Sequence, residues 1–282
     1  MSYRSENIDE RGYIYGKWMV KPGVWAITYR WINFMYLIEG DERALLIDTG
    51  HGEGNLREFV SEIADKEVLV INTHGHYDHT GGNGWWKQAQ MHEKGTVTAK
   101  KSFGPIHDEW AAKLPHLDYE IKALDDGDYI DLGNRVVEII GIPAHNESSI
   151  AILDKQSKLL FTGDELESGQ VLMFVTNEEI SQEDIIRKHK SNMEKLHRRI
   201  QEIDFICPAH NGIMLYPEKY ITDFIALAEQ LLTDSAVPQP DTAGFGFPAD
   251  TSSSPHGFNR FGPLVRYQYG GASFIFKEDD QK

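Results

Sequence analysis

The stretch VLVINTHGHYDHTGG, from Val68 to Gly82, ends an aliphatic run with three histidines and one aspartate inside six positions. The short apolar run at its start is typical of a strand that is buried on both faces. Residues two apart on an extended chain point to the same side, so His74, His76 and Asp78 can converge. His79 needs a turn, which the glycines that follow it permit. Imidazole and carboxylate groups bind zinc, iron or manganese, and the stretch therefore predicts a metal site.

A single ion cannot readily take four ligands from so short a loop. Two adjacent ions can, with the first two histidines on one ion and with Asp78 and His79 on the other. Such a centre needs further ligands, which are expected as isolated histidines or aspartates at the ends of other strands. Three residues follow apolar runs in this way, namely His145 after RVVEIIGIPA, Asp164 after KLLFTG and His210 after FICPA. The alternative, that these are surface or hydrogen-bonded core residues, is disfavoured because so many donors share one sequence context.

The composition restricts the class of partner. The chain has 282 residues, with 28 lysines and arginines against 44 aspartates and glutamates, and a formal net charge of −16. Such a chain should repel nucleic acid and anionic membrane surfaces, although a local basic pocket could still bind a small anionic substrate. Cys207 is the only cysteine, so no intramolecular disulfide can form, which fits a reducing compartment. The polar N-terminus lacks the apolar stretch of a signal peptide, and no run has the length of a membrane-spanning helix. We therefore expect a cytoplasmic protein, whose oligomeric state the sequence leaves open.

The hydrophobic pattern predicts a mixture of strands and helices. Residues 13–48 are expected to form several strands, and residues 53–66 a helix with one apolar face. A later helix begins at Ser181, where Asp184 completes a capping box. Another helix spans residues 217–232, with a proline in its first turn.

The composition changes after Leu232, which predicts two parts of unequal size. We expect a catalytic domain over residues 1–232. Residues 233–282 are expected to form a C-terminal aromatic loop and a hairpin, turning at Gly270–Gly271, that packs back on the same domain. The phenylalanines of the loop disfavour the alternative of a disordered linker.

Four segments carry a family resemblance, namely THGHYDHTGG, IPAHNESSI, FTGD and CPAHNG. From Gly23 to Tyr216 the chain resembles the metallo-β-lactamase-fold hydrolase superfamily. The resemblance implies an α+β fold, a four-layer αββα sandwich, with its site at one edge where strand ends gather. It also implies a ligand set: His74, His76 and His145 on one ion, Asp78, His79 and His210 on a second, and Asp164 on both.

The resemblance further implies two divalent metal ions per chain, zinc first, with iron or manganese as alternatives. A water between two such ions loses a proton near neutral pH and becomes a nucleophile, with Asp78 and Asp164 as the catalytic carboxylates. Asp48, in LLIDTG, resembles the family's aspartate that orients a ligating histidine. The alternative for Asp48 is an ordinary turn residue after a strand.

The chain departs from the sequence patterns of several branches of the family, and these departures narrow the range of expected substrates. Asp164 and the missing signal peptide disfavour a true β-lactamase, and Glu167 stands where homoserine-lactone lactonases carry a tyrosine. His76 and the chain length disfavour the flavodiiron oxidoreductases, and the negative charge disfavours the RNA-processing nucleases. The glyoxalase-II-like branch of thioesterases and small-molecule esterases remains. In the loop after His145, Glu147 is expected to face solvent, with an orientation towards the substrate as the alternative.

We therefore predict a dinuclear-metal hydrolase that uses a metal-bridging hydroxide on a small-molecule ester, thioester, lactone or phosphodiester. One alternative is a mononuclear iron persulfide dioxygenase, and a second is a non-catalytic binding module of the same fold. Phe174, His256 and Phe258 are the expected substrate contacts, although Phe174 also fits an ordinary core strand. Residues 96–124 are expected to form a flap, and His51 is expected near the mouth of the site.

Overall fold

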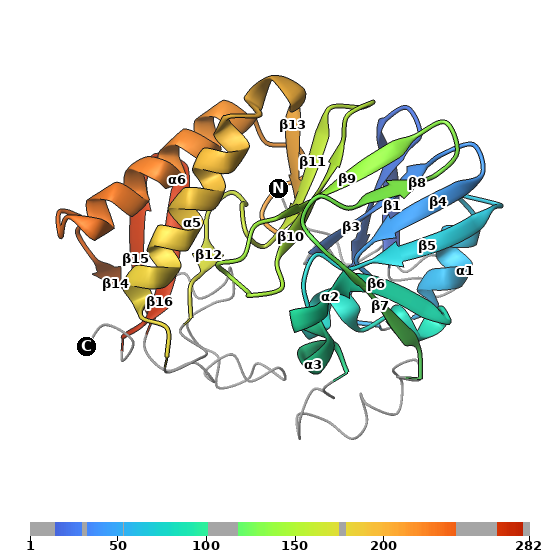
Figure 1. Ribbon diagram of the computed structural model, residues 1–282, viewed down its shortest axis with the longest axis horizontal. Coiled ribbons are helices and arrows are strands. Elements are labelled where there is room, and N and C mark those ends of the chain that lie inside the picture. Colours follow the sequence, from blue (N-terminus) through green and yellow to red (C-terminus); the bar gives the residue numbers. More distant parts are fainter. Residues whose placement is uncertain are drawn as a thin grey trace, which may run out of the picture.

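The computed structural model describes residues 15–29, 33–52, 54–100, 118–174, 179–240 and 264–278. Two β-sheets pack face to face in it, and helices cover their outer sides (Figure 1). Within these ranges the larger sheet has seven strands in chain order, the first four antiparallel and the others added in parallel. Its strands are β1 (Tyr15–Lys21), β2 (Val24–Tyr29), β3 (Asn33–Glu39), β4 (Arg43–Ile47), β5 (Glu67–Ile71), β6 (Gln88–His92) and β7 (Glu120–Leu124).

The facing sheet has five strands in the described part of the chain, in the order β13, β11, β10, β9 and β8. Neighbouring strands are antiparallel except β11 and β13, which run in parallel. The strands are β8 (Tyr129–Asp131), β9 (Val136–Gly141), β10 (Ile150–Asp154), β11 (Leu159–Gly163) and β13 (Phe205–Pro208).

Alternating side chains on the strands build the core. Leu45 and Ile47 of β4 point between the two sheets and share a buried cluster with Ile152 and Phe161 of the facing sheet. Leu46 points the other way, into a cluster that includes residues of helix α1. This alternation follows from the two-residue period of a strand. Helix, sheet, sheet and helix therefore lie in four layers, which confirms the predicted α+β αββα sandwich.

The outer layers are formed by amphipathic helices. α1 (Leu56–Ser61) covers the larger sheet, whereas α5 (Gln182–His197) and α6 (Pro217–Leu232) lie side by side over the smaller one (Figure 1). The predicted capping box is present, because Ser181 Oγ accepts from the Asp184 amide at 3.1 Å. The remaining helical segments are short: α2 (Tyr77–Thr80), α3 (Thr96–Ala99) and the 3₁₀ turns η1 (Asn83–Trp85), η2 (Glu93–Gly95) and η3 (Ile200–Glu202).

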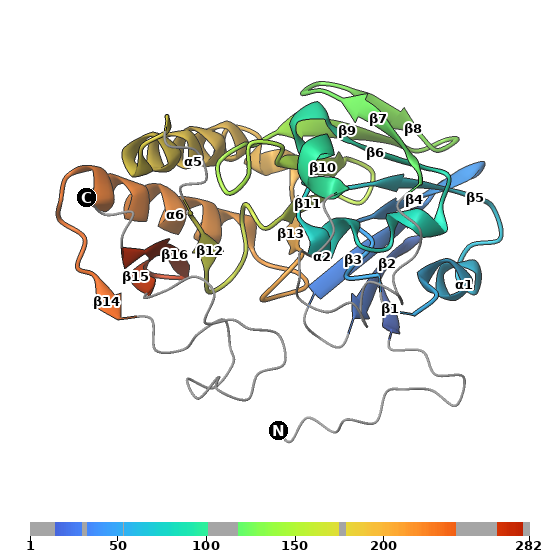
Figure 2. The same ribbon diagram turned by 90° about the horizontal axis from the view of Figure 1, so that it is seen from below.

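A third, small sheet packs beneath α5 and α6. The predicted hairpin is present as β15 and β16, and Gly270 at its turn has a φ of 56°, a left-handed value that favours glycine. Phe274 and Phe276 of β16 are buried in the same cluster as Phe224 of α6, and Figure 2 shows the hairpin against that helix. The sheet order is β12, β16, β15 and β14. Its strands are β12 (Val171–Leu172), β14 (Gln239–Pro240), β15 (Leu264–Tyr269) and β16 (Ala272–Lys277).

The strand before the histidine motif differs from the prediction. It was expected to be buried on both faces, but Val68 and Leu69 are only half-buried, whereas Val70 and Ile71 are buried. In the described residues β5 pairs with β6 only at Ile71 and Gln90, so the two strands diverge. The divergence leaves a groove against α1 that is lined by the first half of β5.

The flap predicted over residues 96–124 is regular structure at both of its ends. Its first residues form α3, and its last form β7, which extends the larger sheet beside β6. Residues 101–117, and residues 241–263 of the predicted aromatic loop, lie outside the described ranges. Among the described residues no helix is both long and apolar enough to cross a lipid bilayer.

Candidate metal centre

The histidine loop leaves the end of β5 and turns directly into α2. Position 75, between His74 and His76, has no room for a side chain and therefore requires glycine. A Cβ atom at this position would lie 2.2 Å from Thr98 Oγ1 and 2.5 Å from the carbonyl oxygen of Gly95. The segment formed by η2 and α3 therefore packs so closely against the loop that only glycine fits, and this contact fixes where the two histidines emerge.

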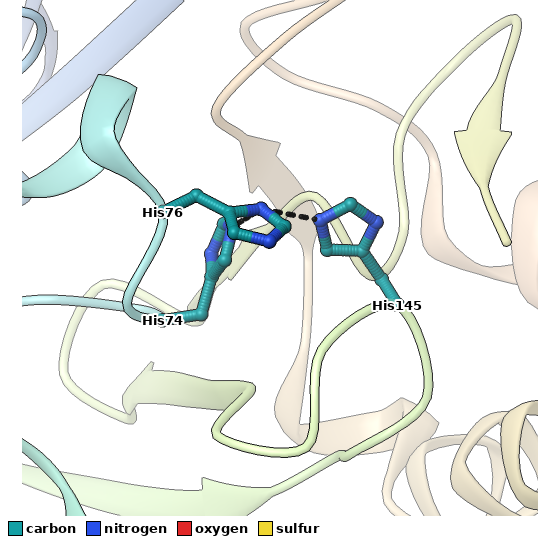
Figure 3. A group of neighbouring side chains, drawn as sticks. All are labelled: His74, His76 and His145. Carbon is teal, nitrogen blue, oxygen red and sulfur yellow. Dashed lines mark hydrogen bonds between the residues drawn. The ribbon is translucent and has the colours of Figure 1, made fainter. Parts of the chain in front are cut away.

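His74, His76 and His145 form the first group of donor side chains (Figure 3). Nε2 of His74 lies 2.9 Å from Nδ1 of His76, and Nε2 of His145 lies 3.2 Å from the same atom. The rings meet steeply, with interplanar angles of 77° and 87°, so their nitrogens rather than their faces converge. Two segments 69 residues apart in sequence thus supply one cluster of three nitrogens.

The orientation of His145 is set by two hydrogen bonds. Its Nδ1–H donates to the carbonyl oxygen of Leu172 at 2.7 Å, and its amide donates to Glu165 Oε2 at 2.9 Å. Because a carbonyl oxygen can only accept, Nδ1 carries the proton and Nε2 keeps its lone pair for the cluster.

Asp78, His79, Asp164 and His210 form the second group, with ligand atoms all within 4.8 Å of one another. Oδ2 of Asp78 lies 3.2 Å from Nε2 of His210 and 3.4 Å from Nε2 of His79. Oδ1 of Asp164 lies 3.2 Å from Nε2 of His79 and 3.5 Å from Nε2 of His210. Two imidazoles and two carboxylates therefore face a common centre.

Asp164 connects the two groups. Its Oδ1 faces the second group, and its Oδ2 lies 3.6 Å from Nε2 of His145 in the first group. It follows the end of β11, which runs between β10 and β13. Each group is therefore reached by a different oxygen of one carboxylate.

Asp48 lies behind the second group, where the sequence predicts an orienting residue. Its Oδ2 accepts from His79 Nδ1 and from Thr73 Oγ1, both at 2.8 Å, and its Oδ1 accepts from the Thr73 amide at 2.8 Å. With its Nδ1 proton donated to Asp48, His79 presents Nε2 to the other donors.

The first group consists of neutral imidazoles. Burial lowers the pKa of His74 well below its usual value, and the neighbouring His79 and His76 lower it further. Burial also lowers the pKa of His76 to about 4 and lowers the pKa of His145. Because neutral imidazole is the form that binds a metal ion, this group has its lone pairs available near pH 7.

The second group has the opposite electrostatics. Burial depresses the pKa of His79, but the negative charges of Asp164, Asp78 and Asp48 outweigh that effect and hold it well above its usual value. For His210, the carboxylates of Asp164, Asp78 and Glu167 overcome burial and raise the pKa to about 10. Protons on these histidines thus balance the carboxylates, and a divalent cation can take over that positive charge by displacing them.

The donor geometry fits metal ions better than hydrogen bonds alone. Nε2 of His79 and Oδ1 of Asp164 are buried and only 3.2 Å apart, yet among the described residues neither atom makes a hydrogen bond of good geometry. In the first group, the unprotonated Nε2 of His145 faces Nδ1 of His76, and their lone pairs repel unless a proton or a cation lies between them. Nitrogen and carboxylate donors are the set that zinc, iron and manganese accept.

The other predicted site residues have different outcomes. Phe174 is half-buried and lines a cleft together with His145, so it lies beside the first group. His51 stacks on the ring of Tyr29, with centroids 4.9 Å apart. The two predicted tail contacts, His256 and Phe258, lie outside the described residues.

Two buried carboxyl groups near the centre are absent from the predicted set. Glu165 is fully buried, burial raises its pKa to about 8, and its side chain holds the amide of His145. Glu167 is buried as well, and burial and the charge of Asp164 hold its pKa well above its usual value. The sequence offered one indication of their role. Both glutamates lie in the segment DELE, within three residues of the predicted bridging residue Asp164.

The sandwich and its paired donor groups define a metal-binding α+β protein. The sequence profile of the metallo-beta-lactamase superfamily matches residues 28–210, a stretch that contains every donor described above. The chain belongs to the metallo-beta-lactamase superfamily. Among solved structures, a metallo-beta-lactamase from Pontibacter korlensis superposes with a TM-score of 0.56 at 16% identity, covering 76% of this chain and 99% of that one, which supports the fold.

Curated relatives fall in the predicted glyoxalase-II-like branch. The chain is 27% identical over 175 residues to the acyl-coenzyme A thioesterase MBLAC2 of Homo sapiens, covering 52% of this chain and 63% of that protein. It is 29% identical over 139 residues to a hydroxyacylglutathione hydrolase of Synechococcus sp., covering 49% of this chain and 50% of that protein. The chain thus spans between half and two thirds of the length of these two relatives.

Proposed function

We propose that this protein is a dinuclear-metal hydrolase that cleaves a small-molecule thioester. The observation that carries the proposal is the position of Asp164, whose two oxygens face two separate donor groups. A carboxylate shared in this way suits two adjacent cations. The superfamily membership and the thioester substrates in the relatives' names favour a thioester over the ester, lactone and phosphodiester alternatives.

In this proposal each donor has a defined role. Zinc is the expected metal, with iron or manganese as alternatives. The ligands would be His74, His76 and His145 for one ion, Asp78, His79 and His210 for the other, and Asp164 for both.

Bound divalent cations would supply a nucleophilic water at neutral pH and polarise the scissile carbonyl. The chain's own residues hold that arrangement in place. Asp48 fixes the ring of His79, and the carbonyl of Leu172 fixes the ring of His145. In the overall reaction a C–O bond forms and the C–S bond breaks, so one water and one thioester give a carboxylic acid and a thiol.

Elemental analysis of the purified protein, combined with a thioesterase assay, tests the proposal. About two equivalents of metal per chain are expected, together with hydrolysis of an acyl thioester. His79→Ala and Asp164→Ala should lose metal and activity together. His197→Ala, an exposed histidine paired only with Glu218 among the described residues, is the matched control and should lose neither.

Two outcomes would contradict the proposal. Full thioester hydrolysis by either metal-site variant would show that the ligand assignment is wrong. One equivalent of iron, with oxygen-dependent oxidation of a persulfide and no hydrolysis, would replace the hydrolase with the mononuclear dioxygenase.

A further inference from the structure

We propose that Asn146 is a positioning residue for His76, and that its side-chain amide lowers the affinity of the first group for its metal ion. This role rests on the ligands assigned in the proposed function. A nitrogen of a neutral imidazole can bind a metal ion only if the other ring nitrogen carries the proton. A hydrogen-bond acceptor behind the ring therefore favours metal binding, and a hydrogen-bond donor in that place opposes it.

Acceptors lie behind the rings of the other two histidines of the first group and behind the ring of His79. The partners of His79 and His145 are the carboxylate and the carbonyl oxygen described above. Nδ1 of His74 lies 3.2 Å from Thr73 Oγ1. Because that hydroxyl donates its own proton to Asp48, it accepts from His74. These three rings can therefore each present an unprotonated Nε2.

His76 has the opposite ring orientation and a different kind of partner. Its Nδ1 faces the first group, 2.9 Å from Nε2 of His74, and its Nε2 points away from that group. Nε2 lies 3.1 Å from Nδ2 of Asn146, its one hydrogen-bond partner in the part of the chain that the structure describes. If Nδ1 is to bind a metal ion, Nε2 must carry the proton. Two N–H groups then face each other across this contact.

The amide of Asn146 cannot remove this conflict by turning over. Its Oδ1 accepts from the Ser148 amide at 2.9 Å and from Ser148 Oγ at 2.7 Å. In the reverse orientation the oxygen would accept from His76, but the NH₂ group would face the Ser148 amide, which can only donate. One contact between two hydrogen-bond donors therefore remains in either orientation.

The same hydrogen bonds fix the position of the His76 ring. Gly75 and Asn146 both bind Ser148, so the two loops that carry the first group are joined. The side chains of His76 and Asn146 are half-buried and Ser148 is buried, so water supplies the missing acceptor only in part. Partners that orient a metal ligand change metal affinity by roughly 10- to 100-fold. For this half-buried contact we expect the lower end, a loss of about tenfold.

Asn146→Asp tests this role, because aspartate has the same shape and two acceptor oxygens. One oxygen can accept from Nε2 of His76 and the other from Ser148, so both N–H groups have acceptors. The new carboxylate lies behind the His76 ring and does not reach the metal position. In competition with a chelator, one of the two stepwise metal dissociation constants should fall about tenfold, and the other should change by less than about twofold.

Two controls separate the hydrogen bond from other effects. Lys94→Gln changes the net charge by the same amount beside the same loop, because Lys94 is 54% exposed and lies 3.7 Å from Glu147, the neighbour of Asn146. Glu147 is 46% exposed and faces solvent, as predicted. Lys94→Gln should leave both constants within about twofold of the wild type. In a His145→Ala background, which lacks a ligand of the first group, Asn146→Asp should leave the remaining constant unchanged.

Proton exchange provides a readout that a change in stability would not produce. In protein loaded with cobalt(II), the ring N–H protons of ligating histidines are shifted out of the main proton NMR spectrum. The Nε2 proton of His76 should exchange rapidly with water in the wild type. In Asn146→Asp it should exchange slowly, because it then has an acceptor.

Equal or weaker metal binding by Asn146→Asp would overturn this role for Asn146 and leave the proposed hydrolase intact. The same tightening in Lys94→Gln would assign the effect to charge and would overturn the role as well. Two bound ions without thioester hydrolysis would contradict the proposed function alone, because both dissociation constants can still be measured. A wild type that binds no metal would refute both.

Discussion

The carbonyl oxygen of Leu172 accepts the Nδ1 proton of His145 at 2.7 Å. Leu172 belongs to β12, which pairs in parallel with β16 of the C-terminal hairpin, and Met173 donates to the carbonyl of Ile275 at 2.8 Å. The hairpin therefore supports a residue of the candidate metal centre, although it lies beyond the part of the chain that the family profile matches.

The guanidinium of Arg266 should control the affinity for metal from a distance. It donates to the Gly169 carbonyl at 2.7 Å and to Gln170 Oε1 at 2.9 Å, and so holds the segment that leads into β12. Arg266→Ala releases that segment and loosens the ring of His145. We expect metal binding to weaken by about tenfold, measured by competition with a chelator. Arg187→Ala, which removes an exposed arginine of α5, is the control. Equal metal affinity in the two variants would show that the hydrogen bonds of Arg266 do not affect metal binding.

Removal of the Asp48 carboxylate should weaken metal binding by the second group of donors. Asp48→Ala leaves His79 without the acceptor for its Nδ1 proton, and the ring then loses its fixed tautomer and direction. A 10- to 100-fold loss of metal affinity is expected, roughly the effect of removing a partner that orients a metal ligand. Asp48→Asn keeps one acceptor oxygen and should lose less. Metal titration of both variants measures the two affinities. A larger loss of metal affinity in the asparagine variant than in the alanine variant would contradict the orienting role of Asp48.

His189 should make the protein less stable in mild acid. It is fully buried between Phe224 and Phe274, donates from Nε2 to the Glu165 carbonyl, and burial lowers its pKa to about 4. Below about pH 6.5 the unfolded chain binds a proton at this residue, while the folded protein does so only near pH 4. The stability that His189 contributes is therefore present above pH 6.5 and is lost as the pH falls through this window.

His189→Gln removes that titration and keeps a donor for the Glu165 carbonyl. Between pH 6.5 and 4 the wild type should lose up to about 1.4 kcal/mol more per pH unit than the variant. Urea unfolding at several pH values measures the difference in unfolding free energy between the two proteins. The contributions of the other buried histidines are the same in both proteins and cancel in this difference. Parallel stability curves for the two proteins would show that His189 does not titrate in this way.

Phe274 should link the C-terminal hairpin to the main core. Its ring is fully buried, with centroids 5.2 Å from Phe224 of α6 and 4.8 Å from His189 of α5. Phe274→Ala should lower the free energy of unfolding by about 3 to 5 kcal/mol, and the loss should appear in a single cooperative transition. Tyr269→Ala, at an exposed position of the same hairpin, is the control. A separate early transition would mean that residues 233–282 fold independently of residues 1–232.

The sequence by itself determined the features that depend on local spacing. The apolar runs of residues 13–48 predict strands, and Ser181 with Asp184 predicts the start of α5. The spacing of His74, His76 and Asp78 predicts donors on one side of a loop. His145, Asp164 and His210 were recognisable because each ends an apolar run, and strand ends gather at one edge of a sheet.

Only the tertiary structure decided which groups support those donors. Nothing near His145 in the sequence points to the carbonyl of Leu172, which is 27 residues away, or to the Glu147 contacts with Lys94 and Lys188. The half-burial of β5 likewise depends on how far β6 diverges from it, not on the apolar run VLVI. Such relations arise from the pairing and packing of distant segments, and their long-range geometry leaves no periodic pattern in the chain.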